Sequence, residues 1–475
     1  MNRREFIIGS SAVSILPLRG ADLVNDSPLR VGILSDIHVS RPELVATDPY
    51  AKACLETGGV FERALRQFRK RGVDAVVIAG DLTEFGLISE LEEVSRIWQK
   101  VFPGDKGADG KRVEKIFVLG NHDAIAWGWK STWTGELWQG RDREEKWNSS
   151  IAKDPARAWK RVFGEDYESL QIKRVRGYNF VMAHWQPADP AAGDWHRGAE
   201  TPGIGEFIKK HQSELEGRAF FFVQHAHPKN TCLPFAASDR GATTKALSDF
   251  PMAIAISGHA HQPLTDERNV WQGKFTSIGA ASLLDAGGRS WRENGAPYAK
   301  GVSTLAKMPY LDTHECRQGQ YALLYPDRLV IERLDFNWGD SVGENWVLPL
   351  PASGRETFGT PEVNIAVPEF ASMAEVSVKQ EGNLLKVIIP AAVNGGRVYD
   401  YEVRVVLIAD DYEAVVSTKR ILAPDYHLPK AKVGRSAEVW FAKSELPIKS
   451  NLRFEVRAFN CFNVSGPAIM LERQT

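Results

Sequence analysis

The chain has 475 residues, of which 43% are hydrophobic and 25% charged, and its formal net charge is −1. This length exceeds one ordinary hydrophobic core and predicts two or three domains of a soluble globular protein. The balanced charge, without a long run of one sign, argues against a nucleic-acid-binding surface and against a disordered acidic tail. The four cysteines include no C-x-x-C pair, which argues against a zinc ribbon but leaves a disulfide open.

The amino-terminal residues have the pattern of an export signal. Arg3 and Arg4 precede a short, weakly apolar run that ends near Pro17. A charged start followed by such a run is typical of a signal peptide. The Arg-Arg-x-Phe-Ile spacing resembles the twin-arginine class, which carries folded proteins across the bacterial inner membrane. We therefore expect residues 1–27 to be a signal peptide and the protein to be periplasmic; a surface amino terminus is the alternative. The run is shorter than the roughly 20 apolar residues of a transmembrane helix, and no later segment qualifies as a membrane anchor.

From residue 29 onward, buried strands alternate with helices. Apolar runs at 30–35, 73–79 and 114–119 predict strands, and the helical spacing of apolar residues covers 60–71 and 87–101. This alternation predicts parallel strand pairing with helices on the faces of the sheet. Residues 124–168 are predicted to be a mostly helical insertion. Further strands are predicted at 178–183, 219–224, 252–257, 275–278, 321–325 and 329–334, and residues 285–316 are predicted to form an irregular loop over the site.

The composition changes after Leu350, where prolines and glycines mark a linker. Beyond it, alternating apolar and polar residues predict strands at 384–389, 401–408, 437–441 and 452–459. Such strands, separated by turn residues, predict an immunoglobulin-like β-sandwich, and residues 452–468 resemble the last strands of a fibronectin type III module. We expect an α/β domain over residues 28–350, and a linker with an all-β sandwich over residues 351–475.

Polar motifs follow five of the predicted strands. They are Asp36-x-His38, Gly80-Asp81, Gly120-Asn121-His122-Asp123, His225 and Gly258-His259-Ala260-His261. Because ligands gather at the carboxyl ends of strands in α/β sheets, we expect these side chains to meet at one edge. Carboxylate, imidazole and amide groups without a thiolate suit zinc, manganese or iron. One aspartate on a sharp turn can bridge two cations about 4 Å apart, the separation at which two metals bind a phosphoryl group.

Each motif alone is weak evidence, because Gly-Asp is a common turn and a single histidine is more often a structural residue. Their occurrence in this order, each directly after a predicted strand, is specific. The glycines before Asp81, Asn121 and His259 are expected to let the backbone turn sharply off the strand.

Together these motifs resemble the signature of the calcineurin-like metallophosphoesterases, a family that includes purple acid phosphatases, cyclic nucleotide phosphodiesterases and DNA repair nucleases. The resemblance covers residues 29–346. It implies a four-layer α/β fold in which two mixed β-sheets pack face to face with helices outside. It also implies two divalent or trivalent metal ions (Mn, Fe or Zn), one held by Asp36, His38 and His261, the other by Asn121, His225 and His259, with Asp81 bridging.

One position departs from the family pattern. The family usually has a histidine close before a proline at the fourth motif, whereas this chain reads Gln224-His225-Ala226-His227-Pro228. His225 is favoured because it comes first after the strand. His227 remains a rival, either as a metal ligand or as a contact to substrate.

The resemblance further implies hydrolysis of a phosphate ester by a metal-bound hydroxide, with a small molecule or a polymer as substrate. His122 would protonate the leaving oxygen or stabilise charge on the phosphoryl group, and Asp123 would hold His122 in place. The sequence does not separate phosphomonoesters from phosphodiesters. The alternative is a catalytically inactive, exported binding protein whose sandwich docks to a carbohydrate or a surface. A plain spacer is the other interpretation of the sandwich.

Overall fold

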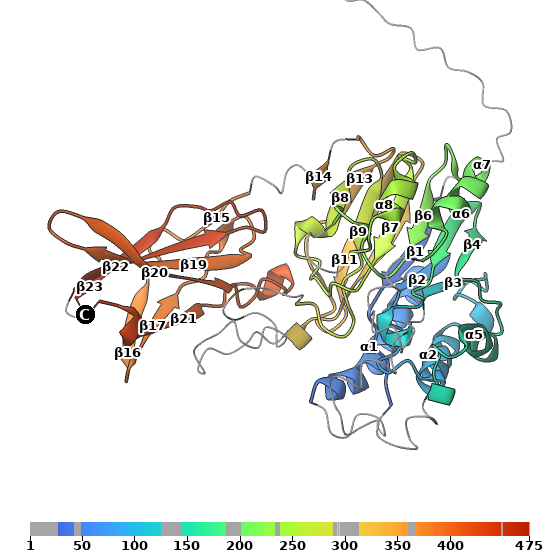
Figure 1. Cartoon of the computed structure of the whole chain (residues 1–475), viewed down its shortest axis with the longest axis horizontal. Coiled ribbons are helices and arrows are strands. Elements are labelled where there is room, and N and C mark those ends of the chain that lie inside the picture. The colour runs from blue at the N-terminus through green and yellow to red at the C-terminus, as the bar shows by residue number, and fades with distance from the viewer. Residues whose placement is uncertain are drawn as a thin grey trace, which may run out of the picture.

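The computed structural model describes residues 27–41, 49–124, 145, 147–186, 201–232, 238–287, 292, 294, 313–354, 356–359, 366–447 and 450–474 (Figure 1). Nearly all of the predicted signal peptide, about half of the predicted helical insertion and most of the predicted loop at 285–316 lie outside the described residues. Within the described ranges, no helix has the length and apolarity needed to cross a membrane.

The first sheet has the strand order β12-β11-β10-β1-β2-β3, with β13 paired to β11. Its strands β1 (Leu29–Leu34), β2 (Ala75–Ala79) and β3 (Glu114–Val118) are parallel, because α1 (Pro49–Arg71) and α2 (Ile88–Val101) return the chain between them. The antiparallel half consists of β10 (Gln318–Leu324), β11 (Arg328–Asp335), β12 (Asp340–Ser341) and β13 (Trp346–Pro349).

The second sheet has the order β14-β8-β9-β7-β6-β5-β4. Its parallel centre consists of β5 (Tyr178–Ala183), β6 (Phe220–Val223), β7 (Ala253–Ser257) and β9 (Thr276–Gly279). Antiparallel strands complete it, namely β4 (Leu170–Val175), β8 (Val270–Gln272) and β14 (Thr357–Phe358). Its helices are α6 (Ile204–Lys210), α7 (Gln212–Leu215) and α8 (Ala242–Leu247).

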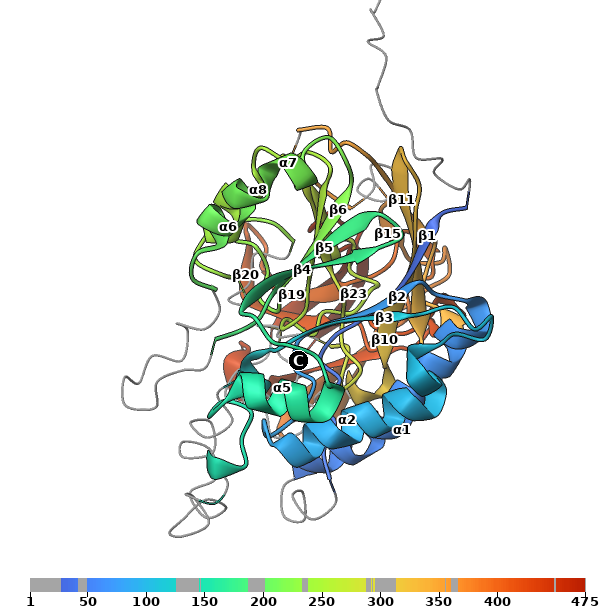
Figure 2. The same ribbon diagram turned by 90° about the vertical axis from the view of Figure 1, so that its right-hand side faces the viewer.

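The two sheets pack face to face, and helices cover their outer faces (Figures 1 and 2). Side chains such as Val77 and Ile254 fill the space between the sheets. Helices α1, α2 and α5 (Pro155–Phe163) cover the first sheet, and α6 and α8 cover the second. The central strands are buried on both sides, which explains why their sequences are almost continuously apolar. This four-layer arrangement of two mixed sheets confirms the predicted α/β fold; we call it the two-sheet unit.

The carboxyl-terminal part is an antiparallel β-sandwich, as predicted. One sheet has the order β16 (Ser377–Glu381), β17 (Leu384–Ile389), β21 (Ala437–Ala442). The other has the order β20 (Glu413–Leu422), β19 (Asp400–Ile408), β22 (Asn451–Phe459), β23 (Ile469–Gln474). A short pair of strands, β15 (Pro368–Glu369) and β18 (Asn394–Gly395), stands beside them. Alternate side chains such as Val387, Val403 and Phe454 form its core. The four cysteines are all unpaired, so the possible disulfide is not formed.

Candidate metal centre

The five motifs converge at the carboxyl ends of β1, β2 and β3 in the first sheet and of β6 and β7 in the second. Their acidic and imidazole groups, together with Glu84, form three clusters, and within each cluster the potential ligand atoms lie within 4.8 Å of one another. The clusters are Asp36 with His38, Asp81 and His261; Asp81 with His225 and His259; and His38 with Glu84 and His122. Asp81 belongs to the first two clusters. It therefore occupies the position expected of a bridging ligand.

The backbone at the site is unusual. Five of the predicted ligands have left-handed φ angles between 41° and 67°, which is uncommon for residues other than glycine; they are Asp36, His38, Asp81, His259 and His261. Hydrogen bonds between neighbouring strand ends hold this backbone in place: Asp36 N donates to Gly80 O and His38 N donates to Asp81 O, both over 3.0 Å. Strain of this kind persists where the surrounding structure fixes it, and it is frequent at functional sites.

Glycines before the ligands act in two ways. Gly80 has a φ of 96°, so it provides the predicted turn into Asp81. Gly120 and Gly258 instead allow close approach. A Cβ atom on Gly120 would lie 2.2 Å from Oδ1 of Asp81, and one on Gly258 would lie 1.8 Å from Oγ of Ser35. Close packing of the loops, more than turn geometry, requires glycine at these two positions.

His38 and His261 lie around the carboxylates of Asp36 and Asp81. Nε2 of His261 lies 2.9 Å from Oδ1 of Asp36. Nε2 of His38 lies 3.6 Å from Oδ2 of Asp81 and 3.9 Å from Oδ1 of Asp36, and it has no hydrogen-bond partner among the described residues. Buried polar atoms are normally paired. A buried nitrogen without a partner, facing two carboxylates, fits a bound cation.

His225 presents the same chemistry on the other side of Asp81. Its Nδ1–H donates to the carbonyl oxygen of Ala79 over 2.7 Å, so in the neutral ring Nε2 carries the lone pair. That nitrogen lies 3.0 Å from Oδ1 of Asn121 and 3.2 Å from Oδ2 of Asp81. The ring of His259 lies 4.9 Å from that of His225. A nitrogen lone pair and two oxygens converge here, and a metal ion satisfies all three.

The electrostatics of the cluster favour cations. Burial acts to raise the pKa of Asp36, but His261 and His225 hold that pKa well below its usual value. Burial likewise opposes ionisation of Asp81, but His225 and His122 lower its pKa. Both carboxylates are therefore ionised at neutral pH. In return, and against the effect of burial, Asp81 and Asp36 raise the pKa of His225 to about 8.

His122 and Asp123 have different surroundings. Nδ1 of His122 lies 3.0 Å from the carbonyl oxygen of Glu84 and 3.4 Å from its carboxylate, and its ring lies 4.5 Å from that of His38. The carboxylate of Asp123 accepts hydrogen bonds from the Thr83 amide at 2.9 Å, the Thr83 hydroxyl at 2.7 Å and the Gly120 amide at 2.8 Å. Asp123 thus joins the loop that contains Thr83 to the loop that contains Gly120. Glu84 lies beside the ring of His122, where we had expected Asp123.

The two candidates of the fourth motif lie in different surroundings. His225 lies in the cluster, whereas Nδ1 of His227 lies 2.6 Å from the hydroxyl of Ser257 and 3.1 Å from Sγ of Cys232. Burial lowers the pKa of His227 to about 4, so its ring is neutral. His227 is buried and belongs to none of the three clusters.

Sequence reasoning missed three residues of the site. Glu84 accepts the Nδ1–H hydrogen bond of His38 over 2.8 Å, and Asp285 pairs with Nδ1 of His261. The ring of Trp185 lies 5.7 Å from that of His225, and its Nε1 has no partner among the described residues. Glu84 lies three residues after Asp81, a spacing that could have drawn attention to it. Asp285 and Trp185 have no comparable signal in the sequence.

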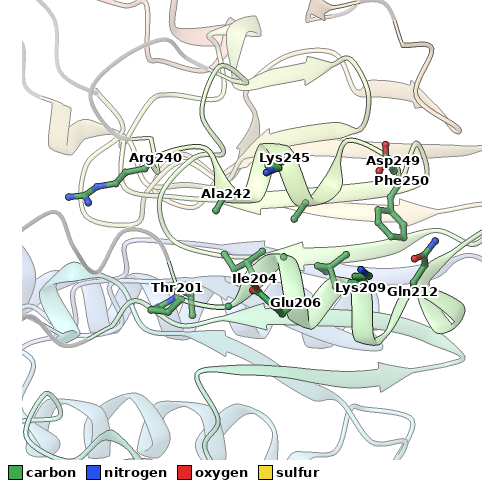
Figure 3. A pocket seen from close by; sticks show the side chains of 15 residues that line it. Thr201, Ile204, Glu206, Lys209, Gln212, Arg240, Ala242, Lys245, Asp249 and Phe250 are labelled. Carbon is green, nitrogen blue, oxygen red and sulfur yellow. The ribbon is translucent and has the colours of Figure 1, made fainter.

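A separate groove of 780 Å³ lies between α6 and α8 (Figure 3). Its walls carry charged side chains from both helices and their flanking loops, among them Glu206, Lys209, Arg240, Lys245 and Asp249. None of the cluster residues lines it. The groove therefore belongs to the outer helical layer and not to the candidate metal centre.

Part of the chain is similar to known proteins. Residues 29–263 match the family model described as calcineurin-like phosphoesterase. A search among curated proteins finds no match. Among solved structures, a dimetal phosphatase from Danio rerio is 13% identical, with 68% of this chain and 99% of that chain covered and a TM-score of 0.41. The purple acid phosphatase PPD1 from seeds of yellow lupin (Lupinus luteus) is 15% identical, with 69% and 54% covered and a TM-score of 0.42. The family match and the buried cluster of histidines and aspartates identify the protein as a phosphoesterase whose residues 29–263 form a calcineurin-like metallophosphoesterase domain.

Proposed function

We propose that the protein hydrolyses phosphate esters with a dinuclear metal centre. The observation that carries this proposal is the shared carboxylate of Asp81, whose Oδ2 lies 3.6 Å from Nε2 of His38 and 3.2 Å from Nε2 of His225. One ion, of manganese, iron or zinc, would be held by Asp36, His38 and His261. The second would be held by Asn121, His225 and His259, with Asp81 shared. Two bound cations neutralise phosphoryl oxygens and lower the pKa of a water molecule, which supplies a nucleophile near neutral pH.

Three histidines are oriented for this role by the partners of their Nδ1 atoms. Glu84 accepts from His38, the carbonyl oxygen of Ala79 accepts from His225, and Asp285 pairs with His261. Each partner fixes the Nδ1–H tautomer and leaves Nε2 to bind metal. Carboxylate partners also increase the basicity of the ligand nitrogen, which strengthens the metal bond.

His122 would handle the proton in the reaction. Its Nδ1–H donates to the Glu84 carbonyl, and its side chain is 17% exposed, whereas those of His38 and His225 are fully buried. In this proposal the nitrogen that meets substrate is Nε2. When protonated, Nε2 would donate a hydrogen bond to a phosphoryl oxygen and then give its proton to the leaving oxygen. Asp123 would act indirectly, because it fixes the Gly120 loop that carries His122.

The proposal extends to organisation and location. The twin-arginine-like residues support a signal peptide over residues 1–27 and a periplasmic protein. The change of composition after Leu350 supports the division into residues 28–350 and residues 351–475. Antiparallel sheets of three and four strands support a fibronectin type III-like sandwich. The substrate class is phosphoesters, with both monoesters and diesters compatible with this chemistry.

Hydrolysis of 4-nitrophenyl phosphate and bis(4-nitrophenyl) phosphate tests the function. We expect turnover of at least one ester, its loss after chelation, and its recovery with Mn²⁺, Zn²⁺ or Fe²⁺. Asp81→Asn should lower kcat/KM by at least about 100-fold, because the shared ligand is lost. Asp249→Asn is the matched control, since this exposed carboxylate lies in the groove between α6 and α8. Absence of turnover with every metal, or equal activity of Asp81→Asn and wild type, would contradict the proposal.

A further inference from the structure

The segment after β9 connects the metal cluster with the carboxyl-terminal sandwich. We define the Asp285 loop as residues 282–287. At its first end, Leu283 N donates to Ser35 O over 3.3 Å and Leu284 N donates to Asp36 O over 3.2 Å. Asp285 then pairs with Nδ1 of His261, whose Nε2 lies 2.9 Å from Asp36. The backbone and one carboxylate of this loop therefore fix both Asp36 and His261.

Two residues further along, the same loop contacts the sandwich. The hydroxyl of Tyr426 donates to the carbonyl oxygen of Gly287. Ala286 packs in a small buried cluster with Cys316 and with Leu428 of the sandwich. Tyr426 is 2% exposed and Asp285 is 3% exposed, so the contacts that link the loop to the sandwich and to the metal cluster are buried. The sandwich thus reaches a point two residues from the partner of a predicted metal ligand.

Contacts made by residues that follow the loop strengthen this attachment. Asn294 makes two hydrogen bonds with the backbone of Leu422, over 2.7 and 3.1 Å, and Arg292 pairs with Asp400 over 2.6 Å. On the returning chain, Gln318 Nε2 donates to His427 O over 2.8 Å, and Cys316 Sγ–H donates to the same oxygen over 3.1 Å. The residues outside the sandwich that make these contacts all follow Gly287, and the last of them, Gln318, is the first residue of β10. Sandwich contacts therefore continue along the chain directly after the Asp285 loop.

We propose that the sandwich is a clamp that holds the Asp285 loop and thereby positions His261 to bind metal. Asp285 and Tyr426 are positioning residues in this scheme, and neither touches the substrate. The reasoning rests on the metal centre of the proposed function. Its physical basis is that partners of a ligating histidine set its tautomer and orientation, and their loss weakens metal binding by about 10- to 100-fold. A carboxylate does this only if the backbone that carries it stays in place.

Zinc titration of chelator-treated, full-length protein tests the clamp by calorimetry. Asp285→Asn removes the charge of the partner of His261 itself. We expect it to weaken zinc binding at one of the two sites by about 10- to 100-fold. Tyr426→Phe removes only the hydroxyl and should weaken the same site by about 3- to 10-fold, the range of one net hydrogen bond. Tyr401→Phe is the matched control, because its buried hydroxyl accepts from Ala392 N over 3.0 Å inside the sandwich. It should bind zinc like wild type.

Thermal unfolding of the zinc-free proteins separates positioning from general stability. Both tyrosine variants lose one buried hydrogen bond, so we expect similar decreases in Tm for the two. Zinc binding by Tyr426→Phe at the wild-type Kd would overturn the clamp, and so would an equal weakening in Tyr401→Phe. If wild type itself binds no zinc, manganese or iron, the proposed function fails and the clamp fails with it. The two failures are therefore distinguishable.

Discussion

Replacing Glu84 by glutamine removes one negative charge from the interior of the site and leaves its shape nearly unchanged. Oε2 of Glu84 lies 2.8 Å from Nδ1 of His38 and 3.4 Å from Nδ1 of His122. Burial acts to raise the pKa of Glu84, but His122 and His38 hold it well below its usual value, so the group is ionised at neutral pH. A glutamine oxygen still accepts from His38, but without the charge that makes this imidazole a stronger ligand.

The size of the effect follows from this geometry. Loss of a carboxylate partner of a ligating histidine costs about 10- to 100-fold in metal affinity, which is about 1.4 to 2.7 kcal/mol. The loss should concern the ion held by His38 more than the ion held by His225. Because the same carboxylate lies beside His122, kcat should fall even when both metal sites are saturated. We expect that decrease to be about tenfold, which is less than the roughly 100-fold or more that a general acid itself contributes, because His122 stays in place.

Calorimetric titration with Mn²⁺ or Zn²⁺, followed by kcat measured at saturating metal, checks both parts. Glu93→Gln is the matched control, because Glu93 is an accessible carboxylate on α2 that pairs with Arg96 over 2.6 Å. That exposed pair contributes little, so the control should behave like wild type. Wild-type metal affinity and wild-type kcat in Glu84→Gln would refute the reasoning about this side chain.

Three further predictions concern other parts of the molecule. His225→Ala should abolish binding of one metal ion and lower kcat/KM by at least about 100-fold, whereas His227→Ala should mainly lower Tm, which metal analysis and thermal unfolding distinguish. Burial raises the pKa of Glu90 to about 8, so the folded protein retains a proton that the unfolded chain loses above pH 4.5. The proton's contribution to the free energy of unfolding is therefore complete below pH 4.5 and is lost as the pH rises to about 8, by up to about 5 kcal/mol. Glu90→Gln should flatten the dependence of Tm on pH between 5 and about 8, and an unchanged slope would disprove that assignment. Removal of metal with a chelator should lower stability by about 3 kcal/mol relative to protein at 100 times the Kd of the metal; an unchanged Tm would contradict this.

Much of the fold could be predicted because its strongest signals are local. Strands β2, β6 and β7 are short apolar runs that end at a polar residue, and such runs require no knowledge of tertiary contacts. Strands β4 and β20 were not predicted. Their side chains are mostly half-buried or exposed, so neither has the apolar run or the clean alternation by which the other strands were recognised.

The residues of the site also divide into those with a local signal in the sequence and those without one. Asp36, Asp81 and His259 follow strands directly, so their convergence could be predicted from the topology. Glu84 and Asp285 could not be assigned to His38 and His261, because those partners are 46 and 24 residues away and meet only after the loops have packed. The choice between His225 and His227 also depended on tertiary contacts. The carbonyl oxygen of Ala79 holds the ring of His225 in the cluster, whereas the hydroxyl of Ser257 pairs with the ring of His227 outside it.

The number of metal ions bound per chain tests the dinuclear centre most directly. Mass spectrometric metal analysis of protein reconstituted separately with manganese, iron and zinc, after removal of free metal, gives this number. The shared position of Asp81 between the two clusters predicts two ions per chain for at least one of these metals. One ion or fewer per chain for all three metals would contradict it.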